Sequence, residues 1–62
     1  MEKANLLTVE ELSEFLNLSK PAVYALVYRR QVPFLKIGNR LRFSPAAIAV
    51  WLEESQVPAK NG

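Results

Sequence analysis

Six basic side chains fall within one stretch of this 62-residue chain that contains no acidic residue. The stretch runs from residue 15 to residue 51, and its basic members are Lys20, Arg29, Arg30, Lys36, Arg40 and Arg42. All six acidic residues lie outside it, so the formal net charge of +2 conceals a strongly cationic middle. A block of one sign attracts a polyanion, although charge runs are more commonly ordinary solvated faces. The elements that carry these charges therefore decide between the two interpretations.

The composition excludes several other kinds of chemistry. The chain has no cysteine and no histidine, which excludes disulfides, thiolate or imidazole metal sites and histidine acid–base catalysis. The carboxylates of Glu10, Glu11 and Glu14 are explained by their position at the start of a predicted helix. Gly38 is interpreted as part of a hairpin turn rather than of a phosphate-binding loop. We therefore predict no enzymatic activity, no metal site and no cofactor.

Length and hydropathy limit the architecture to one small domain. A chain of about 60 residues buries only about 60% of its unfolded surface, so its core is thin. No apolar run approaches the ~18 residues that span a bilayer, and the first residues lack the pattern of a signal peptide. The predicted boundaries are a flexible N-terminus at 1–5, a folded domain at 6–55 and a flexible tail at 56–62.

Three capping signals predict three helices that must position the charges. Thr8 and Glu11 form a capping box, in which each side chain bonds the backbone amide of the other residue. Ser19 and Ser44 are the other two caps, and each precedes a proline in the first helical turn. We expect the first helix to end near Asn17, a residue type that tolerates the left-handed conformation. The short link from there to Ser19 suits a helix-turn-helix.

Apolar residues at helical spacing mark the inner face of each predicted helix. The stripes are Leu12, Phe15 and Leu16 in the first helix, Val23, Leu26 and Val27 in the second, and Ile48, Trp51 and Leu52 in the third. We expect the aromatic residues Phe15, Phe43 and Trp51 to lie in the core.

Between the second and third helices, the run from Phe34 to Phe43 has the pattern of a β-hairpin. Gly38 and Asn39 form a two-residue turn signal, because glycine supplies the positive φ that a tight turn needs. Strand alternation predicts one apolar face and one cationic face. The expected apolar face holds Leu35, Ile37, Leu41 and Phe43, and the expected cationic face holds Lys36, Arg40 and Arg42. Phe34 has the outward parity, which leaves open whether the third helix covers it or a partner contacts it.

The order helix, short turn, helix, basic hairpin, helix predicts a mainly α fold with a small β-hairpin, the winged helix-turn-helix. In that fold the second helix enters the major groove of DNA. The candidate DNA-binding residues lie at the tip and outer face of this helix and on the hairpin. They are Ser19, Lys20, Pro21, Tyr24, Ala25, Tyr28, Arg29, Lys36, Asn39, Arg40 and Arg42.

The candidates on the second helix also have structural explanations. Lys20 could be a solvated charge at a helix start, but its place at the tip favours a phosphate or a guanine edge. Tyr24 and Tyr28 could pack with their hydroxyls in water, and we favour DNA contact for Tyr24 while leaving Tyr28 open. Arg29 and Arg30 could merely complement the helix C-terminus, and we expect one of them, preferably Arg29, to contact phosphate.

The hairpin arginines, Arg40 and Arg42, could only solubilise an exposed face. Their alternation with apolar residues favours contact with the DNA backbone or minor groove.

The outer face of the second helix is chemically poor, because Pro21, Ala22 and Ala25 offer no side-chain hydrogen bonds. We therefore expect modest selectivity from a single copy, with specificity coming from several copies or from DNA shape. If about four or five phosphates are neutralised, log K falls with log salt at a slope of about −4.

Five segments in order resemble the small excisionase-type, MerR-like winged helix-turn-helix domains of bacteria, phages and mobile elements. The segments are LLTVEEL at 6–12, LSKPAVY at 18–24, VP at 32–33, KIGNRLRF at 36–43 and IAVWL at 48–52. The resemblance covers residues 6–54 and implies a DNA-binding protein. In that family such domains act as excision directionality factors, which bend and coat DNA beside an integrase, or as small transcriptional regulators.

The chain departs from this family pattern at two positions. The family usually places one or two basic residues directly after the position of Ser19, whereas here Lys20 is followed by Pro21, which removes one expected phosphate contact. The family also often has glycine where Arg30 stands. Arg30 is therefore expected either to adopt that turn with strain or to extend the second helix.

The leading hypothesis is a small DNA-binding protein of excisionase type, acting in excision or in the DNA architecture of a mobile element. Transcriptional regulation is the alternative, and a protein-interaction adaptor using Tyr28, Phe34 and Val50 is a hypothesis from another class. The expected partners are double-stranded DNA, an integrase or recombinase and neighbouring copies on DNA, with no membrane partner and a monomer in free solution. The absence of cysteine fits a reducing compartment, so we expect a cytoplasmic protein that joins the nucleoid when bound to DNA.

Overall fold

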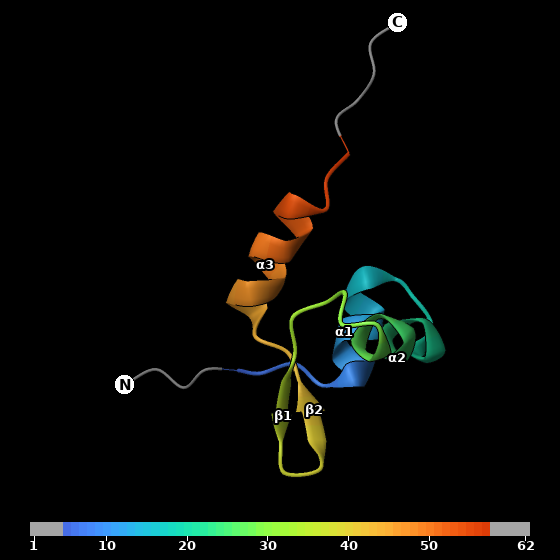
Figure 1. Cartoon of the computed structure of the whole chain (residues 1–62), viewed down its shortest axis with the longest axis vertical. Helices are drawn as coiled ribbons and strands as arrows, with labels where there is room; N and C mark the ends of the chain where they lie inside the picture. Colours follow the sequence, from blue (N-terminus) through green and yellow to red (C-terminus); the bar gives the residue numbers. More distant parts are fainter. Residues whose placement is uncertain (1–4, 58–62) are drawn as a thin grey trace, which may run out of the picture.

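Three helices and a two-stranded antiparallel hairpin follow one another along the chain in the predicted order (Figure 1). The computed structural model describes residues 5–57. Its elements are α1 (Val9–Leu16), α2 (Lys20–Tyr28), β1 (Leu35–Ile37), β2 (Arg40–Arg42) and α3 (Pro45–Glu54). None of the helices in this part of the chain is both long and apolar enough to cross a bilayer. The predicted winged helix-turn-helix is confirmed, whereas the expected flexible ends lie almost entirely outside the described residues.

The predicted helix ends are confirmed. The amide of Glu11 donates to Thr8 Oγ1 at 3.1 Å and the amide of Thr8 donates to Glu11 Oε1 at 2.9 Å, which completes the capping box. Ser19 and Ser44 each accept a bond at 3.2 Å from the amide three residues later. Asn17 ends α1 in the left-handed conformation with φ 58°. Each hydroxyl cap typically stabilises a helix by about 1 kcal/mol, so local sequence fixes all three helix starts.

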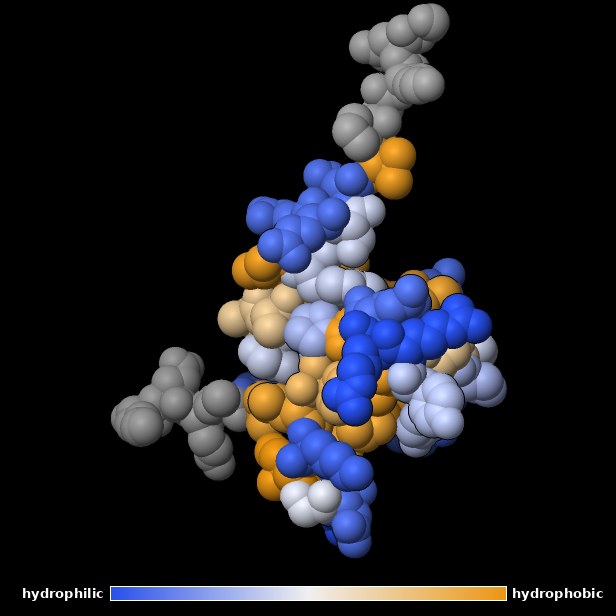
Figure 2. Space-filling model, in the orientation of Figure 1, coloured by the Kyte–Doolittle hydropathy of each residue, from blue (hydrophilic) through white to orange (hydrophobic). Residues whose placement is uncertain are grey.

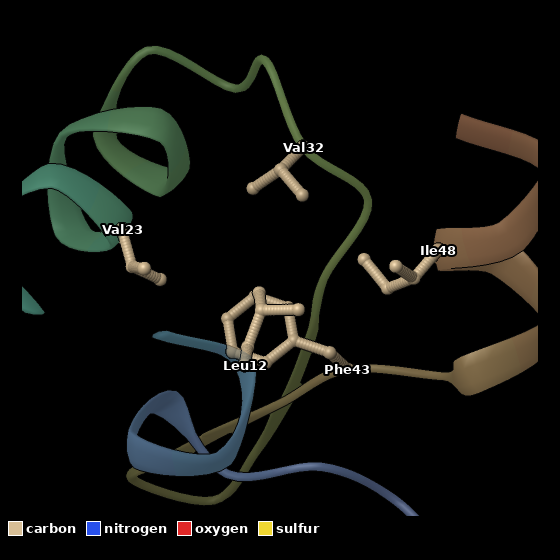
Figure 3. Close-up of a cluster of buried hydrophobic side chains, with 5 residues drawn as sticks. All are labelled: Leu12, Val23, Val32, Phe43 and Ile48. Carbon is tan, nitrogen blue, oxygen red and sulfur yellow. The ribbon is translucent and has the colours of Figure 1, made fainter. Parts of the chain in front are cut away.

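Five buried side chains, each from a different segment, form the core (Figure 3). Leu12 comes from α1, Val23 from α2, Val32 from the connector, Phe43 from the position directly after β2 and Ile48 from α3. Phe43 and Leu12 lie at the centre of the close-up, and the other three point toward them. Because the five residues come from five different segments, their packing fixes how the three helices, the connector and the segment after β2 lie relative to one another.

Two further contacts join distant segments. Leu7 and Phe43 exchange backbone bonds of 2.8 and 2.9 Å, which ties the chain before α1 to the end of β2. The indole Nε1 of Trp51 donates to the carbonyl oxygen of Gln31 at 2.7 Å, which ties α3 to the connector after α2. The hairpin and α3 are therefore both anchored to the helix pair by hydrogen bonds as well as by the core.

The core predictions hold for one aromatic residue, hold in part for a second and fail for the third. Phe43 is fully buried, and Trp51 is half-buried against the core. Phe15 is 64% exposed, so its predicted core position is wrong. In α1 the covered residues are Leu12 and Ser13, with Leu16 packed against the core, whereas the other elements leave most of Phe15 uncovered. Phe15 instead borders an apolar hollow of about 260 Å³ that also involves Ile48 and other residues of α3.

The predicted division of the hairpin into an apolar and a cationic face is wrong. The register pairs Leu35 with Arg42, Lys36 with Leu41 and Ile37 with Arg40. Directly opposed residues of an antiparallel pair share a face, so a two-residue turn reverses the parity between the strands. One face therefore holds Lys36 and Leu41, and the other holds Leu35, Ile37, Arg40 and Arg42. Both faces mix apolar and basic side chains.

The same register settles the position of Phe34. Continued by one residue, it places Phe34 opposite Phe43, on the face shared by Lys36 and Leu41. Phe34 is half-buried and packs against the core cluster. It also borders a small hollow beside Ala47 in the first part of α3. Phe34 is thus a packing residue that closes the base of the hairpin.

Candidate nucleic-acid interface

The outer face of α2 and one face of the hairpin enclose a cleft of about 870 Å³. The predicted site residues that line it are Pro21, Tyr24, Ala25 and Tyr28 from α2 and Lys36 and Asn39 from the hairpin. Figure 2 shows hydrophilic surface over the hairpin tip and over the helix pair, with apolar surface between them. The sequence-predicted residues of two separate elements therefore face one another across a shared concavity.

A second hollow, of about 480 Å³, lies beside β2 and the starts of α1 and α2. It brings Lys20 together with Arg40 and Arg42. Tyr24 and Asn39 line both hollows, so the two form one continuous concave surface. All the predicted site residues except Ser19 and Arg29 line this surface, which we call the concave surface below.

The two exceptions have structural roles at the ends of α2. Ser19 is the N-cap, and its Oγ accepts from the amide of Ala22. Arg29 is the C-cap residue, and its side chain is exposed away from the cleft lining. A DNA contact by either residue stays a prediction.

Arg30 lines the cleft, although the sequence favoured Arg29. α2 ends at Tyr28, and Arg30 adopts the left-handed conformation with φ 55°. This turn is the strained alternative of the two that the sequence allowed. The frequent glycine at this position in the resembling family was the signal that could have identified Arg30 as the residue redirected toward the cleft. A left-handed residue other than glycine stores roughly 1–2 kcal/mol of strain.

The helix that forms one wall of the cleft is anchored on its opposite side. Val23 is fully buried, whereas Tyr24 is 51% and Tyr28 90% exposed. The packing alternative for Tyr28 therefore does not hold within the described residues. Along α2, Pro21 is exposed between the tip and Tyr24, and Ala25 is exposed between the two tyrosines. Their short side chains leave the backbone of α2 accessible. This face can approach another surface closely but offers few hydrogen bonds of its own.

The hairpin that forms the other wall projects away from the helices (Figure 1). Its turn contains Gly38 at φ 62°, and a Cβ added there would meet no atom within 4 Å. Lys36 lies on the face turned toward α2, whereas Arg40 and Arg42 lie on the opposite face beside the second hollow. Arg42 is half-buried, with Nη1 donating to the carbonyl oxygen of Leu41 at 2.7 Å. The hairpin thus carries basic groups on both of its faces.

One ion pair is present within residues 5–57, and it lies on the concave surface. Lys20 Nζ is 2.8 Å from Glu10 Oε2. The hydrogen bond, followed by the charge attraction, raises the pKa of Lys20 above its ordinary value and lowers the pKa of Glu10 below its own. Both groups are therefore charged at neutral pH. In the sequence, Glu10 is explained by its place at the start of α1, and no local signal points to its contact with Lys20.

The comparisons with known proteins agree with this geometry. Residues 6–56 match the family model described as a helix-turn-helix domain. Two similar proteins of Mycobacterium tuberculosis bear the names "Putative DNA-binding protein Rv0500A" (strain H37Rv) and "Putative DNA-binding protein MT0521" (strain CDC 1551 / Oshkosh). Each is 35% identical over 57 residues, which cover 92% of this chain and 73% of the relative. No solved structure shows significant similarity to the chain. On its sequence match and its fold, the chain belongs to the helix-turn-helix domain family.

Proposed function

We propose that this protein binds double-stranded DNA, with α2 in the major groove and the hairpin against the backbone or minor groove. The observation that carries the proposal is the concave surface, which gathers basic residues from both walls around an exposed helix face. The family match and the names of the two mycobacterial relatives support the same function.

The outer face of α2 has a shape compatible with insertion into the major groove. A groove about 12 Å wide admits a helix whose outer side chains are short. Pro21 and Ala25 meet that condition, and Tyr24 adds a ring and a hydroxyl beside them. Lys20 at the start of α2 and Arg30 beyond its end then lie where the two phosphate backbones border the groove.

The poor hydrogen-bonding capacity of α2 limits the sequence information that one copy can read. Arginine, lysine, asparagine and glutamine are the usual base readers, and only Lys20 occurs within α2. We propose that specificity comes from DNA shape and from copies bound side by side. This behaviour favours an architectural role in the excision of a mobile element, with an integrase or recombinase as partner. A regulator that binds operator DNA is the alternative.

Binding as a function of salt tests the proposal. We expect the affinity for a random-sequence duplex to fall with salt at a log–log slope of about −4, as expected for about four or five neutralised phosphates. A slope near zero would contradict DNA binding through the concave surface.

Gel shifts on the genomic DNA that flanks the coding sequence then separate the two roles. A cooperative ladder with bending supports the architectural role, whereas a single palindromic footprint supports the regulator.

A further inference from the structure

Glu10 is the one acidic residue among the described residues that line the concave surface. Its carboxylate accepts a hydrogen bond from Lys20 at 2.8 Å, and the two side chains are 71% and 52% exposed. Ion pairs this exposed contribute little to the stability of a fold. The pair therefore matters mainly for what it does to the surface around it.

The contact occupies the group that a DNA backbone would use. Lys20 stands at the tip of α2, and its ammonium group is a donor for a phosphate oxygen or a guanine edge. A carboxylate oxygen at 2.8 Å is an anionic acceptor of the same kind as a phosphate oxygen. Because the ammonium group has three donors, a phosphate that approaches Lys20 either displaces Glu10 or shares the ammonium group with it, and in both cases it approaches the negative charge of that carboxylate.

We propose that Glu10 lowers the affinity of the protein for the DNA backbone by competing with phosphate for Lys20. The inference rests on the proposed DNA-binding function and adds a regulating residue to the same surface. Glu10 acts through Lys20, so it is a positioning residue rather than a group that contacts DNA.

The competition weakens sequence-independent binding more than specific binding. Sequence-independent binding comes almost wholly from phosphate contacts and counterion release. By neutralising Lys20, the carboxylate lowers the number of cationic side chains available to phosphates by about one. At a preferred site, Lys20 can gain a guanine edge in exchange for Glu10, a contact that is selective for base and geometry. The ratio of specific to non-specific affinity is therefore higher with Glu10 than without it.

The substitution Glu10→Gln tests the inference, because it keeps the size of the side chain and removes the charge. The probe is a random-sequence duplex of about 20 base pairs. We expect several-fold tighter binding than for the wild type and a log–log salt slope steeper by about 1. The matched control is Glu14→Gln, which changes the net charge equally on the same helix at a residue outside the concave surface. We expect the control to change the affinity much less, because exposed charges are screened at a distance.

A second pair of variants tests whether Glu10 acts through Lys20. In a protein that already carries Lys20→Gln, adding Glu10→Gln should tighten DNA binding much less than it does in the wild type. The double-mutant cycle measures the difference between these two gains in affinity. Equal gains in both backgrounds, or equal gains from Glu10→Gln and Glu14→Gln, would overturn the inference while leaving DNA binding intact. A wild-type protein with no salt-dependent binding would overturn the proposed function as well. Circular dichroism checks that each variant is folded, as expected because the Thr8 and Glu11 cap is untouched.

Discussion

The two walls of the cleft are built in opposite ways. α2 is capped by Ser19, held by the fully buried Val23 and bears few charges on its outer face. The hairpin has strands of three residues with no fully buried side chain, and it carries Lys36, Arg40 and Arg42. The position of α2 is therefore fixed by packing against the core, whereas the main contribution of the hairpin is its basic charge.

This difference separates two tasks that a DNA-binding surface must perform. A rigid helix fixes the shape that enters a groove, whereas basic groups on a small projecting hairpin can follow a backbone whose charge is uniform. Substitutions of the buried side chains beneath α2 should therefore lower the stability of the fold. Substitutions of the basic side chains on the hairpin should instead lower the affinity for DNA.

The largest effect is expected at Phe43, where the two walls meet in the core. Phe43→Ala should destabilise the fold by about 3–5 kcal/mol, the range for removing a buried aromatic ring. Urea denaturation followed by circular dichroism measures the change. Val57→Ala, at a residue that is 86% exposed, is the control and should stay within about 0.5 kcal/mol. A loss below about 1 kcal/mol at Phe43 would show that the walls do not share a core.

The next effect concerns the charge of the hairpin. Arg40→Ala combined with Arg42→Ala should weaken DNA binding roughly 10- to 100-fold and make the log–log salt slope shallower by about 2. Arg29→Ala combined with Arg30→Ala removes the same charge from the end of α2, and its effect should be smaller because Arg29 lies outside the concave surface, whereas Arg40 and Arg42 both line it. Fluorescence anisotropy over a salt series measures both pairs. Equal losses would break the proposed division between helix and hairpin, and unchanged binding would favour a protein-interaction adaptor.

A smaller effect is expected from the cap of α2. Ser19→Ala removes the bond to the amide of Ala22 and should destabilise the protein by about 1 kcal/mol. Ser44→Ala removes the equivalent cap from α3 and serves as the control. Thermal unfolding should show similar losses for the two variants, whereas DNA binding should weaken only for Ser19→Ala. If both caps affect DNA binding equally, the first turn of α2 has no special role at the interface.

The smallest effect is expected at Arg30, where the backbone strain and the side-chain charge can be removed separately. Arg30→Gly should stabilise the fold by up to about 1 kcal/mol, because glycine adopts a φ of 55° without strain. It should also weaken DNA binding, because Arg30 lines the cleft. Arg30→Ala loses the same charge but keeps the strain, so it should weaken binding without the gain in stability. Thermal unfolding and anisotropy of the two variants decide whether the effects are separable.

Features set by neighbouring residues could be predicted from the sequence. The caps at Thr8, Ser19 and Ser44 and the left-handed end at Asn17 depend on interactions within a few residues. The turn at Gly38 belongs to the same class. These local signals, taken in order, were sufficient for the fold.

Features set by how the elements meet could not be predicted in the same way. The faces of the hairpin are an intermediate case, because the predicted two-residue turn already implies the register, and Arg40 and Arg42 were misassigned by carrying one strand alternation through that turn. The exposure of Phe15 depends on how much of α1 the other elements cover. The contact of Glu10 with Lys20 joins two helices whose relative placement is a product of folding.

The backbone pairing of Leu7 with Phe43 has a consequence for the order of assembly. α1 and α2 are neighbours along the chain, and local contacts of this kind form quickly. The pairing of Leu7 with Phe43 joins distant parts of the sequence, so its loop must close before the contact can stabilise anything. During synthesis the helix pair can therefore form before the hairpin has a place to dock. The concave surface, which takes residues from the helix pair and from the hairpin, therefore depends on this long-range pairing as well as on the local contacts of α1 and α2.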